Sequence, residues 1–298
     1  MRKIITIGNF DGIHLGHRKL LQIMLDESHS RALQSVVITY RNHPAYTLYH
    51  PSHPLLIMPI ETKIKQLRCM GIDQIEVLDF TPEFASRSAV DFLRYYLIPV
   101  FHPSVIVVGF DSHFGKAREG DYQFLRQYAD EYGYELIYVE PVLHEGSPVS
   151  SSMIRNLLHR AKITEANSLL ASPFTLRGKV VSGKGWGRDL GFPTANIEPE
   201  DPLQLVPGKG IYLSKVHLPE GTFYGLTNIG TSPTLKMDGV VQIETYIIDF
   251  SGDIYGLTIE VGLISYLRNE LIFQSKEELI EAMRNDLAQA KRIIGNLS

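Results

Sequence analysis

Short runs of β-branched and other apolar residues alternate with amphipathic stretches through the first half of the chain. The runs that we expect to form strands lie at residues 3–7, 35–40, 75–78, 105–108 and 136–139. Short strands with few polar positions, separated by helices, are typical of a parallel sheet that is covered on both faces. Right-handed crossovers then bring the carboxyl ends of the strands to one edge, where ligands bind.

The pattern changes near Ser172. Residues 171–194, ASPFTLRGKVVSGKGWGRDLGFPT, are rich in Gly and Pro, and β-rich runs follow with no helical pattern between them. Consecutive short strands of this kind favour an antiparallel barrel or sandwich. A length of 298 residues allows two domains or one large α/β domain. The change of pattern favours two, an α/β domain at 1–172 and a β-barrel domain at 173–298.

The chain closes with a helical pattern that begins at a capping box, in which Glu278 follows Ser275 by three residues. The apolar stripe of this helix comprises Leu279, Met283, Leu287, Ala290 and Ile294. We expect the stripe to pack against the barrel.

Composition and charge narrow the classes of ligand and compartment. A hydrophobic content of 44% is that of a soluble globular protein, and a net charge of −4 gives no overall attraction to nucleic acid or anionic lipid. A small ligand fits this balance better than a polymer. The single cysteine, Cys69, cannot form an internal disulfide, which favours a reducing compartment. Because we find no signal-peptide pattern and no apolar run of membrane-spanning length, we expect the chain to be cytoplasmic.

The stretch GNFDGIHLGH, residues 8–17, follows the first expected strand and leads into a helical pattern. A strand, bend and helix start in this order leave backbone N–H groups unpaired, which suits an anionic ligand. Gly8 and Gly12 would let the backbone approach a phosphate closely. His14 and His17, three residues apart, would share a face and donate hydrogen bonds to one phosphate chain. The alternative is that the glycines only form a turn and the histidines lie on the surface.

Two later segments of the first domain should reach the same edge of the sheet. GFDSHFGKAREGD, residues 109–121, follows the fourth expected strand, and PVSSSMIRNLL, residues 148–158, follows the fifth. In the second segment, serines can cap a helix and offer hydroxyls to phosphate, and Arg155 supplies a planar, permanently charged fork. Helix capping alone is the structural alternative.

The barrel half carries a second set of candidate residues, in GKGWGRDLGFPTAN at 183–196. Gly183 and Gly185 give a loop that can wrap phosphates, and Thr194 and Asn196 offer hard oxygen ligands suited to magnesium. A simple turn is the alternative.

Glu244 is the candidate base, because phosphoryl transfer to a hydroxyl needs a carboxylate that can accept its proton. Strand alternation places Gln242, Glu244 and Tyr246 on one face, where plain solvent exposure is the alternative. A second acid, Glu270, lies beside Arg268, which indicates a structural pair or an exposed side chain, and we leave it out of the catalytic set.

These segments together resemble a known family over essentially the whole chain. GNFDGIHLGH resembles the phosphate site of the HxGH nucleotidyltransferase superfamily, and GxxxGRxLGFPTAN resembles the riboflavin kinase signature. With HP at 43–44, GxD and FG within 109–115, and SSxxIR at 150–155, the chain is similar to bacterial bifunctional riboflavin kinase/FAD synthetases. The resemblance implies a Rossmann-like nucleotidyltransferase domain with a parallel sheet, followed by a riboflavin kinase β-barrel that ends in a helix.

The resemblance also implies residue roles in the first domain. His14 and His17 would bind the ATP phosphates during adenylyl transfer. The nucleotide site would be completed by Asn9, Asp11, Ser151 and Arg155, with Asp111 beside the FMN and adenine pockets. Between GxD and FG the family usually has an aromatic residue and then a basic or small one, where this chain has Ser112 and His113.

In the barrel, the resemblance implies that Thr194 and Asn196 hold the metal ion of the nucleotide and that Glu244 is the catalytic base. The family has a histidine two residues after this glutamate, where this chain has Tyr246. The partner that would orient Glu244 is therefore open.

The function that the resemblance implies is the phosphorylation of riboflavin by ATP to give FMN, followed by transfer of AMP from a second ATP to give FAD and pyrophosphate. Both steps would need magnesium, and no nucleic acid or membrane partner is expected. The alternatives are that only one activity is retained, or that the chain is a non-catalytic flavin or nucleotide sensor. A zinc enzyme and a GxGxxG dehydrogenase are disfavoured because neither motif is present, and the oligomeric state is not predicted.

Overall fold

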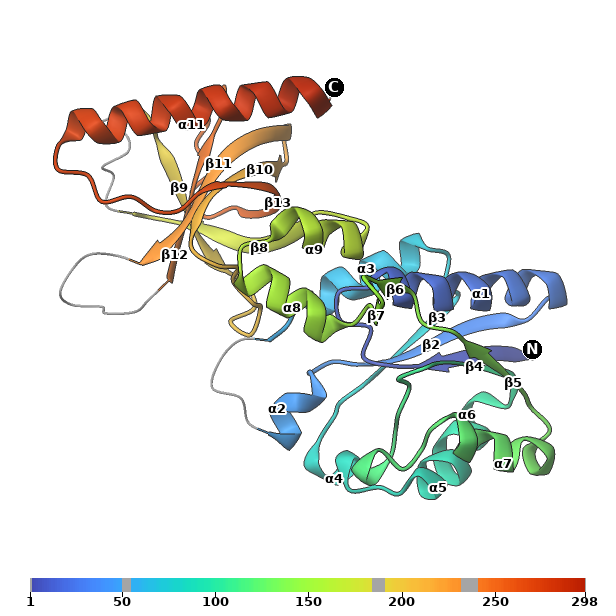
Figure 1. Cartoon of the computed structure of the whole chain (residues 1–298). Coiled ribbons are helices and arrows are strands. Elements are labelled where there is room, and N and C mark those ends of the chain that lie inside the picture. Colours follow the sequence, from blue (N-terminus) through green and yellow to red (C-terminus); the bar gives the residue numbers. More distant parts are fainter. Residues whose placement is uncertain (1, 50–54, 184–190, 232–240, 298) are drawn as a thin grey trace. The chain divides into compact units, whose positions relative to one another are not determined.

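The computed structural model describes residues 2–49, 55–183, 191–231 and 241–297. The chain divides into two compact units, Met1–Ser151 and Ser152–Ser298 (Figure 1). Helices α8, Ser151–His159, and α9, Ile163–Leu170, follow this division, whereas the sequence pattern changes only after them. Asn167 of α9 donates a hydrogen bond to the carbonyl of Leu263 at 2.8 Å, which ties this helix to the barrel of the second unit. The boundary at Ser172 stays a prediction.

The first unit contains a parallel sheet of five strands, in the order β3-β2-β1-β4-β5. The strands are β1, Lys3–Ile7; β2, Gln34–Tyr40; β3, Gln74–Leu78; β4, Pro103–Gly109; and β5, Glu135–Val139. This confirms the predicted strands and the parallel sheet. Because β2 and β4 flank β1 on opposite sides, the strand order reverses there, and ligands bind at the carboxyl ends of strands at such a switch point.

Helices cover both faces of this sheet, because successive side chains of each strand point to opposite faces. Ile4 and Val37 are buried with residues of α1, Leu15–Arg31, and α3, Ile60–Cys69. Ile5 and Ile38 are buried with residues of α5, Ala89–Phe92; α6, Ile98–Phe101; and α7, Tyr122–Tyr132. Figure 1 shows these two groups of helices on opposite sides of the sheet.

The shorter elements of the first unit are α2, Pro44–Leu48; α4, Pro82–Ala85; a π-helix, Leu93–Leu97; a 3₁₀-helix, Lys116–Arg118; and the paired strands β6, Leu143–His144, and β7, Ser147–Pro148.

The second unit contains a closed barrel whose neighbouring strands are all antiparallel, in the order β10-β11-β12-β9-β8-β13. The strands are β8, Phe174–Val181; β9, Thr194–Pro199; β10, Gly210–Leu218; β11, Gly221–Thr231; β12, Val241–Ile247; and β13, Thr258–Arg268. Inside the barrel, the hydroxyls of Ser214, Thr227 and Thr245 form a chain with O···O distances of 2.8 and 2.9 Å. The predicted antiparallel barrel is therefore confirmed.

The C-terminal helix α11, Lys276–Leu297, packs on the outside of this barrel. Its stripe residues Leu287, Ala290 and Ile294 lie against a cluster that includes Leu213 and Leu226. At the start of the helix, Ser275 Oγ accepts from the backbone N–H of Glu278 at 3.2 Å, as the capping box predicts. The carboxylate of Glu278 accepts from Gln274 N at 2.9 Å, one residue before the cap.

The partner of Arg268 is Asp286 of α11 and not the neighbouring Glu270. Nε and Nη2 of Arg268 donate to the two carboxylate oxygens of Asp286 at 2.8 and 2.7 Å. Asp286 is buried, so this two-pronged pair fixes the helix to the end of β13.

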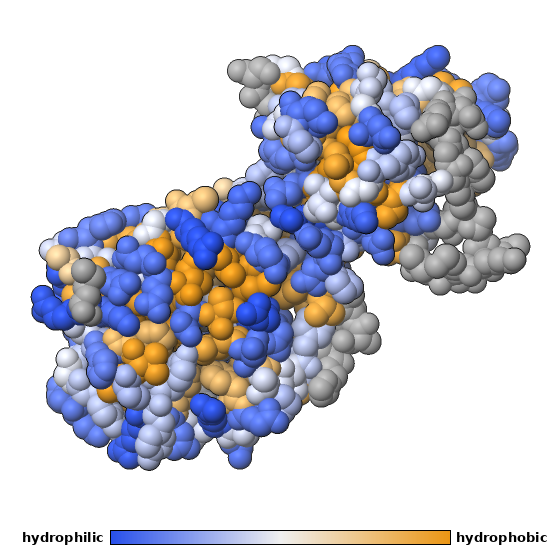
Figure 2. Space-filling model, turned by 180° about the vertical axis from the view of Figure 1, so that it is seen from behind, coloured by the Kyte–Doolittle hydropathy of each residue, from blue (hydrophilic) through white to orange (hydrophobic). Residues whose placement is uncertain are grey.

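The surface is mostly polar and charged, with apolar side chains gathered in patches on the face that Figure 2 shows. Cys69 is exposed and is not in a disulfide. Among the helices of the described residues, we find none long and apolar enough to cross a membrane.

Candidate active sites

The loop after β1 holds two buried residues in a left-handed backbone conformation. Phe10 has φ 51° and Ile13 has φ 41°, and between them Gly12 has φ 85°. Residues other than glycine rarely adopt positive φ, and a β-branched residue least of all. Phe10 is 2% exposed and Ile13 is fully buried, and both pack beneath α1. Strain of this kind persists only where the surroundings impose it, and it is concentrated at functional sites.

Asp11 fixes this loop from inside the protein. Its carboxylate accepts hydrogen bonds from the backbone N–H of Ile57, at 3.0 and 3.2 Å, and of Met58, at 3.1 Å. Asp11 is only 2% exposed. The structure therefore does not bring the Asp11 side chain into the pocket described below, although the sequence predicts it as a nucleotide contact. Gly12, also predicted as a nucleotide contact, does not line this pocket either, and its positive φ serves the turn.

Lys63 of α3 holds the loop from the other side. This side chain is 4% exposed, and its Nζ donates to the carbonyl oxygens of Asn9 at 2.8 Å and of Tyr40 at 2.9 Å. The two bonds join the carboxyl ends of β1 and β2. Burial lowers the pKa of Lys63 to about 8, while the nearby Asp11 carboxylate acts in the opposite direction. Lys63 was not among the predicted site residues, because a lysine in an amphipathic pattern is usually on the solvent face.

The predicted histidine pair lies at the start of α1. His14 is the N-cap residue, and its Nδ1 accepts from the backbone N–H of His17 at 3.4 Å. The two rings lie on one side, as the three-residue spacing predicts, and they also stack, with centroids 3.6 Å apart. Burial, and then the neighbouring His14 and Lys63, hold the pKa of His17 well below its ordinary value. At neutral pH His17 is therefore uncharged, and its buried Nδ1 has no hydrogen-bond partner among the described residues.

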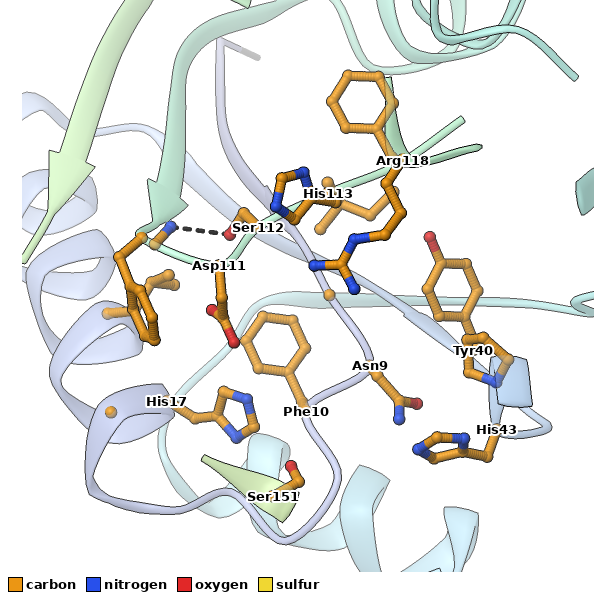
Figure 3. Close-up of a pocket in the computed structure, with 18 of the residues that line it drawn as sticks. Asn9, Phe10, His17, Tyr40, His43, Asp111, Ser112, His113, Arg118 and Ser151 are labelled. Atoms are coloured by element: carbon orange, nitrogen blue, oxygen red, sulfur yellow. Dashed lines mark hydrogen bonds between the residues drawn. The ribbon is translucent and has the colours of Figure 1, made fainter. Parts of the chain in front are cut away.

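A pocket of about 580 Å³ opens beside these histidines, at the carboxyl ends of β1 and β4 (Figure 3). Its volume is within the usual range for a small-molecule site. Of the predicted site residues, those that line it are Gly8, Asn9, His14, His17, Asp111 and Ser151. Ser151 Oγ donates to the carbonyl of Asp11 at 3.0 Å, which connects the start of α8 to the loop. Arg155 lies on α8 within the second unit, and its role stays a prediction.

Ser112 and His113, the two residues after β4 that depart from the family pattern, have different positions. Ser112 Oγ accepts from the backbone N–H of Gly109 at 2.8 Å, so this serine closes the turn that follows the strand. His113 is exposed and lines the pocket. His43 also lines it, and its Nδ1 accepts from Ala45 N at 3.1 Å, which makes this histidine the N-cap of α2.

The predicted residues of the barrel meet on neighbouring strands. In the ladder between β9 and β12, Asn196 lies opposite Glu244, and Thr194 lies opposite Tyr246. These residues point out of the barrel, since the alternate residue Thr245 is buried inside it. The predicted strand alternation is confirmed, and Glu244 is half-buried instead of fully exposed. The ring of Tyr246 packs against Phe192, with centroids 5.3 Å apart.

Asn228 of β11 extends this row of polar residues, because it lies opposite Glu244 on its other side. Its Oδ1 is buried and has no hydrogen-bond partner among the described residues. Asn228 was not among the predicted site residues, since one asparagine in a strand carries no motif. Gly183 lies at the same place, where a Cβ atom would be 1.9 Å from Asn196 Nδ2. Gly185 lies outside the described residues.

The donor atoms of this row fit magnesium, a hard cation that takes oxygen ligands. Thr194, Asn196, Asn228 and Glu244 offer hydroxyl, amide and carboxylate oxygens, and one of these is the orphaned acceptor of Asn228. Within the described part of the chain, we find no group of three His, Cys, Asp or Glu side chains that could hold a metal ion. A cavity of about 310 Å³ is lined by Thr194, by Thr245 and Ile247 of the opposite strand face, and by residues 250–255, whereas Asn196, Asn228 and Glu244 do not line it.

The pKa of Lys63 predicts how stability depends on pH. The folded-state value of about 8 lies below that of an unfolded lysine, about 10.4, so between these values the unfolded chain binds more protons. We therefore expect the free energy of unfolding of the wild type, relative to Lys63→Met, to rise between pH 8 and about pH 10. Urea unfolding of both proteins across this range measures the difference.

The matched control is Lys65→Met, on the exposed face of the same helix. Its difference from the wild type should be constant over the same pH range. A constant difference for Lys63→Met as well would contradict the assignment of a lowered pKa.

Comparison with known proteins follows the same division of the chain. Residues 1–153 match the family model described as FAD synthetase, and residues 170–294 match the model described as riboflavin kinase. The bifunctional riboflavin kinase/FMN adenylyltransferase of Listeria monocytogenes is 33% identical over 298 residues, which are 100% of this chain and 94% of the relative. The protein with this name from Escherichia coli K12 is 35% identical over 98% of this chain and 93% of its own.

A crystal structure described as a macrolide-efflux protein from Streptococcus pneumoniae is 31% identical and superposes with a TM-score of 0.88. The match covers 97% of this chain and 94% of the other. The two family models match the two halves of the chain, and the relatives match it over nearly its whole length. The chain belongs to the bifunctional riboflavin kinase/FAD synthetase family.

Proposed function

We propose that this chain makes FMN and FAD in two steps. The barrel transfers the γ-phosphoryl group of ATP to riboflavin, and the first unit transfers AMP from a second ATP to FMN with release of pyrophosphate. The observation that carries the proposal is that one chain holds both the stacked histidines at the switch point of a parallel sheet and the opposed pair Asn196 and Glu244. The family matches over 1–153 and 170–294 support the same pair of activities.

In the adenylyl step, an oxygen of the FMN phosphate forms a bond to the α-phosphorus of ATP. The bond from this phosphorus to the bridging oxygen breaks, and its electron pair leaves with pyrophosphate. His14 and His17 donate N–H groups to the phosphate chain, together with the backbone at the start of α1. Because the approach of an anion favours the charged imidazole, the proton affinity of His17 increases as negative charge collects on the leaving group.

In the kinase step, Glu244 accepts the proton of the ribityl hydroxyl as this oxygen attacks the γ-phosphorus; the bond from this phosphorus to the β,γ-bridging oxygen breaks, and its electron pair leaves with ADP. Thr194 and Asn196, and with them Asn228, would hold magnesium, which supplies electrostatic stabilisation of the transferring phosphoryl group when it is bound. The ring of Tyr246 packs against Phe192, and Tyr246 lies opposite Thr194 in the ladder. Asn196, directly across the ladder, is the neighbour placed to orient Glu244.

We also propose that the chain works in the cytoplasm on small molecules alone. The free cysteine and the formal charge of −4 support this setting.

Incubation with riboflavin, ATP and magnesium, followed by chromatography over time, tests the proposed function. We expect FMN to accumulate first and FAD to follow, because FMN is the substrate of the second step. FMN without FAD would leave the chain as a kinase only, and FAD formed only from added FMN would leave it as an adenylyltransferase only. A folded protein that gives neither product would contradict the proposal.

His17→Ala should separate the two activities. We expect FAD formation from FMN to fall by about 10²-fold or more, because donors at the phosphate chain are lost, while FMN formation from riboflavin is unchanged. The matched control is His29→Ala, at the exposed last turn of the same helix, which should change neither rate. An equal loss of both activities in His17→Ala would refute the assignment of the adenylyl step to the first unit and of the kinase step to the barrel.

Glu244→Gln should give the opposite result. The amide keeps the shape of the carboxylate but cannot take the proton, so we expect the kinase rate to fall by roughly 10²–10⁴-fold while FAD formation from added FMN persists. Glu220→Gln, at an exposed turn of the barrel, is the control. An unchanged kinase rate in Glu244→Gln would remove this residue from the catalytic set.

A further inference from the structure

The segment after β4 forms a small loop that is anchored at several points. Phe114 and Gly120 exchange two backbone hydrogen bonds, each 2.9 Å, which close residues 114–120 into a loop. Lys116 N donates to the carbonyl of Arg87 at 2.7 Å, and the carboxylate of Glu119 accepts from Ala89 N at 2.6 Å. Both contacts tie the loop to the start of α5, so its tip is held in place.

The tip of this loop is strained at two consecutive residues. Ala117 has φ 53° and Arg118 has φ 62°, although neither is a glycine. Each such residue costs free energy relative to an ordinary conformation, and a glycine at either position would avoid this cost. The observed strain points to a functional constraint on the loop.

The left-handed conformation of Ala117 and Arg118 determines where the Arg118 side chain lies. In Figure 3 its guanidinium points into the pocket that also contains the histidine pair. The ring of Phe10 makes an edge contact with His17 on the far side of this pocket, with centroids 5.2 Å apart. Arg118 therefore enters the pocket from β4, whereas the histidines enter it from β1.

Arg118 is also the one lysine or arginine among the described residues that line this pocket. Its guanidinium has no ion pair or hydrogen bond within the described chain. The other nearby cation, Lys63, lies below the loop and donates to two carbonyls. The histidine pair is uncharged at His17. The guanidinium of Arg118 is permanently charged, has no partner within the described chain and is held in the pocket by a strained backbone. Such a group is suited to an anionic group of the ligand.

The adenylyl reaction brings two anionic groups into this pocket, the triphosphate of ATP and the phosphate of FMN. The attacking oxygen must reach the α-phosphorus from the side opposite the leaving pyrophosphate. The start of α1, with its N–H groups, suits the triphosphate. The attacking phosphate then lies on the side from which Arg118 enters.

We propose that Arg118 binds the phosphate group of FMN and positions it for attack, an assignment that rests on the proposed function. The guanidinium offsets the repulsion between the FMN phosphate and the triphosphate, and its fork fixes the orientation of the attacking oxygen.

Steady-state kinetics of FAD formation test this assignment, with FMN and ATP varied separately. For Arg118→Gln we expect the KM for FMN to rise about tenfold or more, while the KM for ATP changes less than about threefold. Arg118→Lys keeps the charge but not the fork and should be intermediate. Arg126→Gln, an exposed arginine of α7 that does not line the pocket, is the matched control and should match the wild type.

Arg118→Gly keeps the test valid if the glutamine variant is poorly folded. Glycine accepts the φ of 62° without strain, so its thermal midpoint should not fall, while the KM for FMN should rise as in Arg118→Gln. Unchanged kinetics in this variant, or a rise confined to the KM for ATP, would overturn the proposal. A wild-type protein that makes no FAD from FMN and ATP would instead overturn the proposed function itself.

Discussion

Two buried charges of opposite sign shape the first site. The Asp11 carboxylate accepts backbone N–H groups from Ile57 and Met58, and the Lys63 ammonium donates to the carbonyls of Asn9 and Tyr40. Burying a charge is costly unless its hydrogen bonds are satisfied, and here backbone groups satisfy them. These hydrogen bonds fix three segments to one another: the end of β1, the end of β2 and the segment before α3. The left-handed conformations of Phe10 and Ile13, and with them the direction in which α1 begins, depend on this arrangement.

The two sites obtain their geometry in different ways. In the first unit the functional groups lie on loops that leave parallel strands, so buried contacts of Asp11 and Lys63 must hold them. In the barrel they lie on the strands themselves, and the ladder between β9 and β12 places Asn196 opposite Glu244. Antiparallel pairing brings such side chains to about 5 Å from each other.

The parts of this structure that follow local periodicity could be predicted from the sequence. The five strands of the sheet, the stacked His14 and His17, and the shared face of Glu244 and Tyr246 all follow from spacing along one segment. The parts that depend on packing could not. A lysine in an amphipathic helix is typical of a solvent face, so the burial of Lys63 was not expected. Asp11 belongs to a phosphate-site motif but points inward, and no glycine marks the left-handed tip that carries Arg118.

The stacking of His14 on His17 has a consequence for the environment in which the nucleotide binds. The two imidazoles lie 3.6 Å apart, and His17, with its strongly lowered pKa, brings no net charge to the start of α1 at neutral pH. In the proposed site, the attraction of these rings for a triphosphate would act through N–H dipoles at contact range, where salt screens less than between exposed charges. On the proposed function, ATP binding at the start of α1 would therefore depend less on ionic strength than binding by a cluster of charged side chains.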